Sequence, residues 1–298
     1  MLGFFIKKIK VVKIVISFSL LLNSVLHVSV VQAHSSYVNA GNVLVSWDIH
    51  NFIGHYPPGG KLTDITFRFT VNNETLHARG TYFAQQFYFD TPEENGGIAY
   101  TGVQPQPDRK GRQYLKAIFS TFIANSTSTD KRCSHGADGG PGVSCYAVIP
   151  ATYGYTYKIL VHKLAAHTWS GEIEEKETGR KIHIGTWTLP EYVGDIKNSG
   201  VGFSEYYLYY KPGYPQFVTP SCDKIAKVNV TFGPVSTTNY GGGVGNVHSP
   251  YEYNTQECLG HKSKYSSRTV KDNVEFPGGK VLSAEGQEIK RGFVSQIK

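Results

Sequence analysis

Glu205 stands in a segment that places one carboxylate among aromatic side chains. If residues 202–210 form a strand, alternation puts Glu205 on the same face as Phe203, Tyr207 and Tyr209. A carboxylate on an aromatic face must be paired or line a cleft, because an unpaired buried charge is costly. Glu205 is therefore a candidate for ligand binding, or for general acid chemistry if its pKa is raised. The alternative is a buried ion pair with an arginine such as Arg68.

A second candidate is the short loop between Cys133 and Cys145, in which five residues are Gly or Pro. A disulfide closing this loop would restrict it and let it present Asp138 and His135 to a ligand. The alternative is a surface turn that the disulfide merely closes, without a role in binding. Calcium usually takes several oxygen ligands, and the single carboxylate of this loop does not favour it. The loop is thus a candidate binding element without a metal.

Three further residues are candidates for binding a sugar. Gln104 is uncharged and can both donate and accept hydrogen bonds, as sugar hydroxyls require. Trp169 and Trp187 stand near strand ends, where an exposed indole face would stack on a sugar ring. The alternatives are a polar strand-end residue for Gln104 and the core for the tryptophans, and we expect the core for at least one of them.

Catalytic and cofactor templates are missing from the sequence. It contains no Gly-x-Ser-x-Gly elbow and no His-Glu-x-x-His motif, and its His residues lack metal-ligand spacing. A two-carboxylate glycosidase would need a partner for Glu205, such as Glu172 or Asp138, but the spacing singles out neither. We therefore assign no catalytic residue, no metal and no cofactor from the sequence.

The elements that must position these residues are β-strands. Apolar residues alternate with polar ones in a series of short segments separated by Gly, Pro, Asn and Asp clusters, and helical periodicity is nearly absent. The pattern predicts an all-β, antiparallel β-sandwich of jelly-roll or lectin-like type. A hairpin turn is expected at Thr178-Gly179-Arg180. The expected strands are 65–71, 82–89, 114–123, 153–164, 168–174, 181–189, 202–210 and 228–232.

The chain is predicted to have three parts. Residues 1–33 are typical of a signal peptide, with four lysines, an apolar run and a cleavage site at Val31-Gln32-Ala33. A membrane anchor is the alternative for this segment. Residues 34–212 are expected to form the sandwich. Residues 213–298, where alternation weakens, are predicted to be a disulfide-linked C-terminal appendage.

Cysteine usage and charge indicate the compartment and the partners. The four cysteines Cys133, Cys145, Cys222 and Cys258 favour two disulfides, with the local pairing Cys133–Cys145 and Cys222–Cys258 preferred among three. Export to the medium or the periplasm is therefore expected. Without the four signal lysines, 26 basic residues face 23 acidic ones, a net charge of +3. This balance predicts no nucleic-acid partner. No membrane partner is expected once the signal peptide has been cleaved.

Between about Thr66 and Tyr210 the chain resembles an exported, uncharacterised family, the domain-of-unknown-function family numbered 3472. The resemblance implies a lectin-like β-sandwich and supplies no catalytic residue. A Trp-x-x-Gly-x-x-Tyr run typical of that family is replaced here by Pro150-Ala-Thr-Tyr-Gly-Tyr. The residues that carry the resemblance are 100–104, 117–120, 154–161, 169–171, 184–190 and 202–206.

These features predict a secreted, non-catalytic binding module whose partner is a glycan or another cell-surface ligand. Its candidate ligand-binding residues are Gln104, Asp138, Trp169, Trp187 and Glu205. Two alternatives stay open: a glycan-active hydrolase that uses Glu205, and an envelope or virulence protein that binds protein partners.

Overall fold

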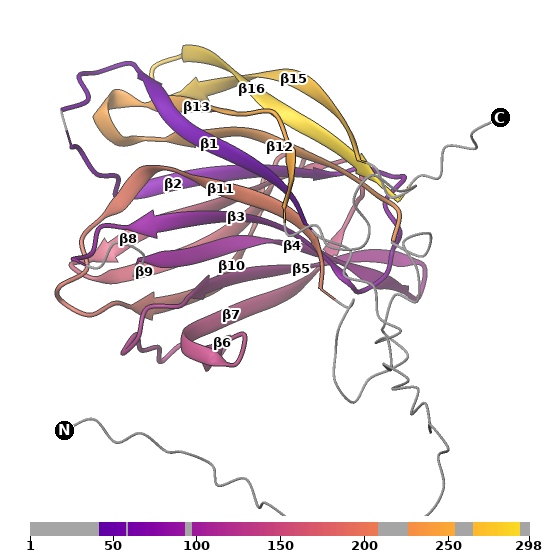
Figure 1. The fold of residues 1–298 in the computed structure, drawn as a ribbon, viewed down its shortest axis with the longest axis horizontal. Helices are drawn as coiled ribbons and strands as arrows, with labels where there is room; N and C mark the ends of the chain where they lie inside the picture. Colours follow the sequence, from indigo (N-terminus) through magenta and orange to yellow (C-terminus); the bar gives the residue numbers. More distant parts are fainter. Residues whose placement is uncertain (1–41, 58, 93–96, 208–225, 254–264, 293–298) are drawn as a thin grey trace, which may run out of the picture. The chain divides into compact units, whose positions relative to one another are not determined.

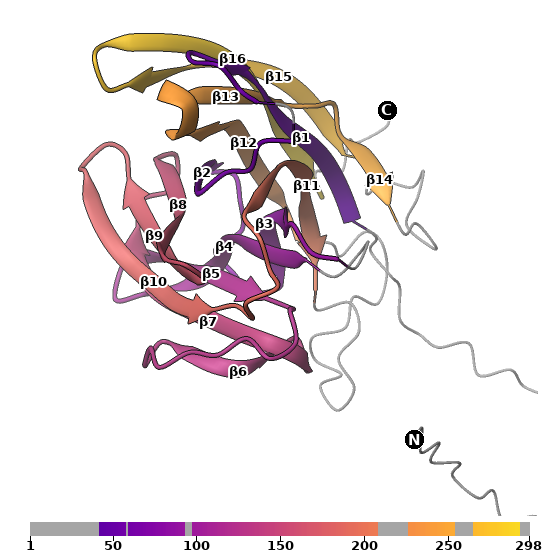
Figure 2. The same cartoon turned by 90° about the vertical axis from the view of Figure 1, so that its left-hand side faces the viewer.

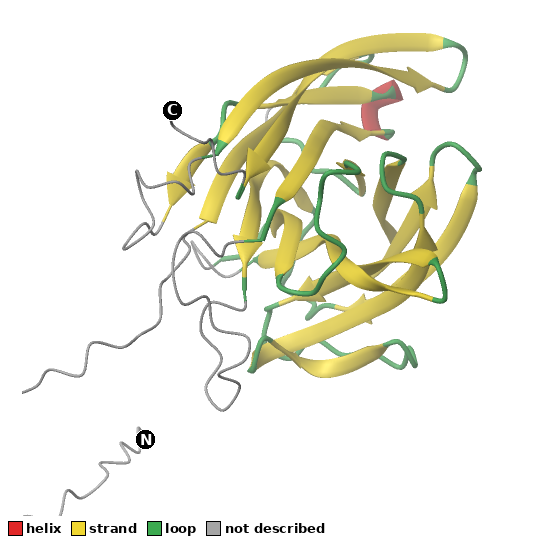
Figure 3. Ribbon diagram, turned by 90° about the vertical axis from the view of Figure 1, so that its right-hand side faces the viewer, coloured by secondary structure: helices red, strands yellow, loops and turns green. Residues whose placement is uncertain are grey.

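The described part of the chain consists almost entirely of antiparallel β-strands. The computed structural model describes residues 42–57, 59–92, 97–207, 226–253 and 265–292. Within these ranges the helical structure is a single 3-10 turn, η3 (Asn239–Gly241), and Figure 3 shows it as a short red segment among yellow strands. No helix in the described ranges is long and apolar enough to cross a membrane. The prediction of an all-β fold is confirmed.

The strands follow one another along the chain with short connections. They are β1 (Asn42–Phe52), β2 (Asp64–Val71), β3 (Thr81–Phe89), β4 (Ile98–Arg109), β5 (Arg112–Thr121), β6 (Cys133–Ala137), β7 (Gly140–Ala151), β8 (Thr156–Ala165), β9 (Thr168–Glu175), β10 (Arg180–Thr188), β11 (Ile196–Tyr206), β12 (Val228–Thr237), β13 (Gly243–Val247), β14 (Tyr251–Tyr253), β15 (Ser266–Phe276) and β16 (Lys280–Arg291).

Hydrogen bonding links these strands into one path that folds back on itself. The order is β10-β9-β8-β2-β12-β13-β1-β11-β3-β4-β5-β7-β6, with β14 paired to β1, and the hairpin β15–β16 joined to β12. In Figure 2 strands β8, β9 and β10 lie across from β3, β4, β5 and β7. Ring contacts between the two layers agree, since Phe89 of β3 packs on Trp169 of β9, and Phe119 of β5 stacks on Trp187 of β10.

The period-two alternation of the sequence decides which side chains fill the space between the layers. In β1 the odd-numbered residues Val43, Val45, Trp47 and Ile49 are buried and the even-numbered ones are more exposed. Trp47 meets Phe67 of β2 edge-on, with ring centroids 5.3 Å apart. Apolar burial of this kind is the dominant stabilising term for such a sandwich.

Most of the expected strands are confirmed with shifts of a few residues at their ends. The hairpin at Thr178-Gly179-Arg180 is also confirmed, because β9 and β10 pair in register on either side of it. Strand β11 begins at Ile196, six residues before the expected start. A run of small or polar residues, Asn198-Ser199-Gly200, hides that part of the strand from a hydrophobicity pattern.

The segment predicted to be a C-terminal appendage contributes strands to the sandwich itself. Strand β12 lies between β2 and β13, and β13 in turn pairs with β1. The described strands all belong to one structural unit. The boundary was placed too early because β12 is buried along nearly its whole length, and its polar residues, such as Asn229 and Ser236, lie inside the fold instead of on an exposed face. The predicted signal peptide, Cys222 and Cys258 lie outside the described residues.

Trp169 and Trp187 lie in the core and are withdrawn from the predicted ligand-binding set. Their exposed fractions are 1% and 0%. An indole ring enclosed between two sheets has no free face on which a sugar could stack. Both tryptophans are therefore part of the sandwich core, the alternative role predicted for them.

Truncating Trp187 should therefore cost stability before anything else. We expect Trp187→Ala to lower the free energy of unfolding by about 3–5 kcal/mol, because it removes the ring that stacks on Phe119 and leaves a cavity. Urea denaturation followed by circular dichroism measures the change. Tyr192→Ala is the control, since Tyr192 is 53% exposed; a Trp187→Ala variant as stable as that control would contradict the core assignment.

Candidate functional site

A cleft opens on the outer face of the layer formed by β11, β3, β4, β5 and β7. Its volume is about 840 Å³. The residues that line it come from alternate positions of adjacent strands, so one face of the layer points into the cleft and the other into the core. The lining comprises Arg79, Tyr82, Tyr100, Gln104, Gln106, Arg109, Lys116, Ile118, Ser120, Asp138, Ser144, Tyr146, Val148, Glu205 and Tyr207.

Strand register sets the order of the central residues across the cleft. Glu205 of β11 lies opposite Tyr82 of β3, and Gln104 of β4 lies opposite Lys116 of β5. Because Phe83 pairs with Val103, the same register brings Tyr82 beside Gln104. One row of side chains therefore runs from a carboxylate through a phenol and an amide to an ammonium group.

Glu205 is a desolvated carboxyl group without a cationic partner among the described residues. Burial raises its pKa, the negative charge of Asp138 raises it further, and a hydrogen bond from the Asn42 side chain acts in the opposite direction. The predicted alternative, an ion pair with Arg68, is wrong. Arg68 lies on β2 and donates to the Pro234 carbonyl oxygen at 2.8 Å and to Ser236 Oγ at 3.0 Å.

Two polar groups at the floor of the cleft have no hydrogen-bond partner in the described structure. The Tyr82 hydroxyl is buried and unsatisfied. Gln104 is only 9% exposed, and no hydrogen bond of its side-chain amide is found within the described ranges. Buried polar groups are nearly always satisfied in folded proteins, so these two are suited to a ligand or to bound water.

Asp138 reaches the cleft from the tip of the hairpin formed by β6 and β7. Its φ of 48° is in the left-handed region, as in many tight turns. The Tyr100 hydroxyl donates a hydrogen bond to the Asp138 carboxylate. Burial, this hydrogen bond and the nearby charges of Asp138 and Glu205 raise the pKa of Tyr100, so the phenol stays protonated at all physiological pH values.

The disulfide Cys133–Cys145 ties the base of that hairpin together, as predicted. The two cysteines face each other across β6 and β7, and the bridge packs on Gly185 of β10, where a Cβ atom would lie 2.5 Å from Cys145 Sγ. A disulfide indicates an oxidising compartment.

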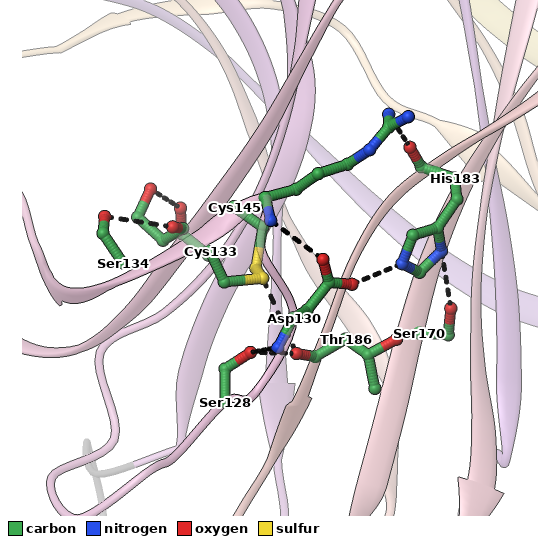
Figure 4. The surroundings of a disulfide bond; sticks show 11 residues. Ser128, Asp130, Cys133, Ser134, Cys145, Ser170, His183 and Thr186 are labelled. Atoms are coloured by element: carbon green, nitrogen blue, oxygen red, sulfur yellow. Dashed lines mark hydrogen bonds and ion pairs between the residues drawn. A yellow bond between two sulfur atoms is a disulfide. The ribbon is translucent and has the colours of Figure 1, made fainter.

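Beside the bridge, Asp130 accepts hydrogen bonds that connect the preceding loop to β10 (Figure 4). Asp130 Oδ2 lies 2.5 Å from His183 Nε2, and Asp130 Oδ1 accepts from the Arg132 amide at 2.9 Å. The hairpin that carries Asp138 is therefore held at its base by a covalent bond and by these polar contacts.

Of the five predicted ligand-binding residues, the cleft collects Gln104, Asp138 and Glu205. Glu172, one of the two partners considered for Glu205, lies on β9 in the other layer, near Lys181, and does not line the cleft. Tyr82, Lys116 and Arg79 were not predicted as site residues. Residues 82–89 carry aromatic side chains at both odd and even positions, a pattern that indicates a strand buried on both sides. No group of three His, Cys, Asp or Glu side chains suited to a metal occurs within the described ranges.

Comparisons with known proteins return solved structures only. No protein-family model and no curated protein matches the chain, so the resemblance to the family numbered 3472 stays a prediction. Scytalido-glutamic peptidase bound to a peptide-based transition-state analogue is 14% identical, covers 83% of this chain and 98% of its own, and has a TM-score of 0.43. SCP-B, a member of the eqolisin family of peptidases bound to the tripeptide Ala-Ile-His, is 13% identical over 84% and 98%, also at 0.43. At this TM-score the likeness assigns no function.

The raised pKa of Glu205 predicts a pH-dependent gain in stability when its charge is removed. The ordinary value is 4.5. Below it, Glu205 is neutral in both the folded and the unfolded chain. As the pH rises from there through the higher pKa of the folded state, the wild type loses stability that Glu205→Gln retains.

We therefore expect Glu205→Gln to match the wild type near pH 4 and to be more stable at pH 7. Urea denaturation at the two pH values measures the difference. A variant less stable than the wild type at pH 7 would show that a cation compensates the carboxylate.

Proposed function

We propose that this protein is a hydrolase that uses Glu205 as its general acid and base, and that its substrates are peptides. The observation that carries the proposal is a desolvated carboxyl group of raised pKa in a cleft whose floor presents the unpaired Tyr82 hydroxyl and, beside it, the Gln104 side-chain amide. This combination supplies both requirements of acyl hydrolysis, a group that moves protons and donors for the developing oxyanion.

The reaction can be followed from these groups. Ionised Glu205 takes a proton from a water molecule as its oxygen attacks the substrate carbonyl carbon. Tyr82 and Gln104 donate hydrogen bonds to the carbonyl oxygen as it gains negative charge. Glu205 then gives the proton to the leaving amine as the carbon–nitrogen bond breaks. A carboxyl group with a raised pKa suits both halves of this cycle, because it gains and loses a proton readily in mildly acidic solution.

Peptides fit the cleft better than glycans for two reasons. A glycosidase needs two carboxyl groups in separate roles, but here the second carboxylate, Asp138, is engaged by Tyr100. Sugar recognition also relies on free aromatic faces. The Trp169 and Trp187 rings are buried, and one face of the Tyr146 ring is occupied by Lys116 Nζ, 4.4 Å from the ring centroid.

We propose further that the protein acts outside the cytoplasm. The Cys133–Cys145 disulfide and the N-terminal segment typical of a signal peptide support this location.

Removing the carboxyl group of Glu205 should abolish the reaction without unfolding the protein. We expect Glu205→Gln to reduce kcat by about 10²–10⁴-fold, the usual contribution of a general acid–base group. Release of new amino groups from denatured protein substrates at pH 3–7 measures the activity. Glu191→Gln, an exposed site outside the cleft, is the control and should retain it. Full turnover by Glu205→Gln, or release of reducing sugar instead of amines, would overturn the proposal.

Asp138 should set the pH at which Glu205 works. Its negative charge raises the pKa of Glu205, so we expect Asp138→Asn to move the limb of the pH–kcat/KM profile that reports Glu205 toward lower pH. The asparagine still accepts a hydrogen bond from Tyr100, so the hairpin contact is kept. Asp90→Asn, outside the cleft, is the control. A shift toward higher pH would show that Asp138 does not act on Glu205 through its charge.

A further inference from the structure

One end of the cleft carries three cationic side chains. Arg79 precedes β3, Arg109 ends β4 and Lys116 lies in the middle of β5. None of the three forms an ion pair with a carboxylate in the described part of the chain, although thirteen such pairs involving other residues occur there. Positive charge therefore gathers in this part of the cleft without an ion pair to any carboxylate of the described residues.

Lys116 is held there at an electrostatic cost. Burial lowers its pKa, the charge of Arg79 lowers it further, and Asp138 acts in the opposite direction from beyond ion-pair distance. Its ammonium group lies over the Tyr146 ring, which compensates only part of the lost hydration. A bound anion would relieve both the desolvation and the repulsion.

Arg79 is oriented at the same end by a neutral partner. Its Nε donates to Gln106 Oε1 at 3.3 Å, and Gln106 is itself fixed by donating from Nε2 to the Pro105 carbonyl oxygen at 2.8 Å. Gln106 is only 3% exposed. Because Gln106 contributes no charge, the remaining guanidinium donors of Arg79 stay available to a carboxylate, which they fit in a forked geometry.

We infer that this cationic end selects peptides that carry a carboxylate a few residues from the bond that is cleaved. The inference rests on the proposed function. Glu205 and Lys116 stand in one row but on β11 and β5, three strand spacings of about 4.8 Å apart. An extended peptide advances about 3.3 Å per residue, so this span of about 14 Å places the carboxylate roughly four residues from the scissile bond. Its source is an Asp or Glu side chain or a free C-terminus.

Matched peptides test the selection. Each set moves a single Glu, or Gln at the same place, through the four positions on either side of the bond, and each peptide is made with a free and an amidated C-terminus. We expect a Glu peptide or a free acid to exceed its neutral match at least tenfold in kcat/KM. Raising the salt concentration should reduce the preference by screening.

Two variants locate the preference in the protein. Lys116→Met and Arg79→Met keep the apolar stems and remove the charges. Each should lower the preference about tenfold, measured as the ratio of kcat/KM for the acidic peptide to kcat/KM for its neutral match on the same variant. Lys181→Met, on β10 in the other layer and paired with Glu172 and Glu174, is the control and should keep the preference. Equal rates for acidic and neutral peptides in the wild type would overturn the inference while leaving the hydrolase intact.

Binding to Glu205→Gln separates this inference from the proposed function. Fluorescence anisotropy of the labelled peptides should show tighter binding of the acidic member, lost in Glu205→Gln/Lys116→Met. If this binding occurs and the wild type cleaves no peptide, the cationic end stands and the hydrolase proposal falls. If an acidic polysaccharide binds there and competes while no acidic peptide binds, the peptide version is overturned.

Discussion

The arrangement of this molecule depends on the cost of burying polar groups on the layer that contains β3, β4 and β5. Strands β3, β4 and β5 turn one set of alternate side chains into the sandwich core and the other set into the cleft. On the core side, apolar contacts such as Phe119 on Trp187 repay the ordering of the chain. On the cleft side of the described structure, the Tyr82 hydroxyl loses water without gaining a partner, and the desolvated Glu205 gains a hydrogen bond from Asn42 but no cation. In the proposed function, a bound substrate supplies the missing hydrogen bond.

The hairpin of β6 and β7 links covalent chemistry to the electrostatics of the cleft. The Cys133–Cys145 bridge limits the motion of the hairpin base, and the contact of Tyr100 with Asp138 docks its tip. Asp138 then acts on two groups at once, raising the pKa of Glu205 and partly supporting the charge of Lys116. Because Asp138 forms no ion pair with a cation among the described residues, its negative charge raises the pKa of the neighbouring Glu205, as like charges generally do.

Much of this arrangement was predictable from local sequence, and the remainder depends on long-range pairing. Alternation predicted the strands and placed Glu205 beside Phe203 and Tyr207, and cysteine spacing predicted the first disulfide. Lys116 and Arg79 could not be predicted as cleft residues, because nothing in the sequence around either of them indicates a binding role. They reach the cleft only through the pairing of β3, β4 and β5. Trp169 and Trp187 misled because a strand-end indole is compatible with surface and core alike, and only the opposite layer decides between them.

The cost of burying charged groups also explains why Glu205 is not paired with the cationic side chains of the cleft. A cation paired with Glu205 would lower its pKa and fix it as a carboxylate. Here Arg109 and Lys116 lie two and three strands away, on β4 and β5, and Arg79, just before the adjacent strand β3, forms no ion pair with Glu205 in the described structure. Glu205 therefore keeps a proton that it can exchange, and Lys116 and Arg79 keep charges that an incoming anion can neutralise. Had the sheet paired these groups with each other, the protein would have gained an internal ion pair and lost both proposed roles, proton exchange at Glu205 and anion binding at Lys116 and Arg79. Under the proposed function, leaving them unpaired makes the cleft dependent on a substrate that spans its width.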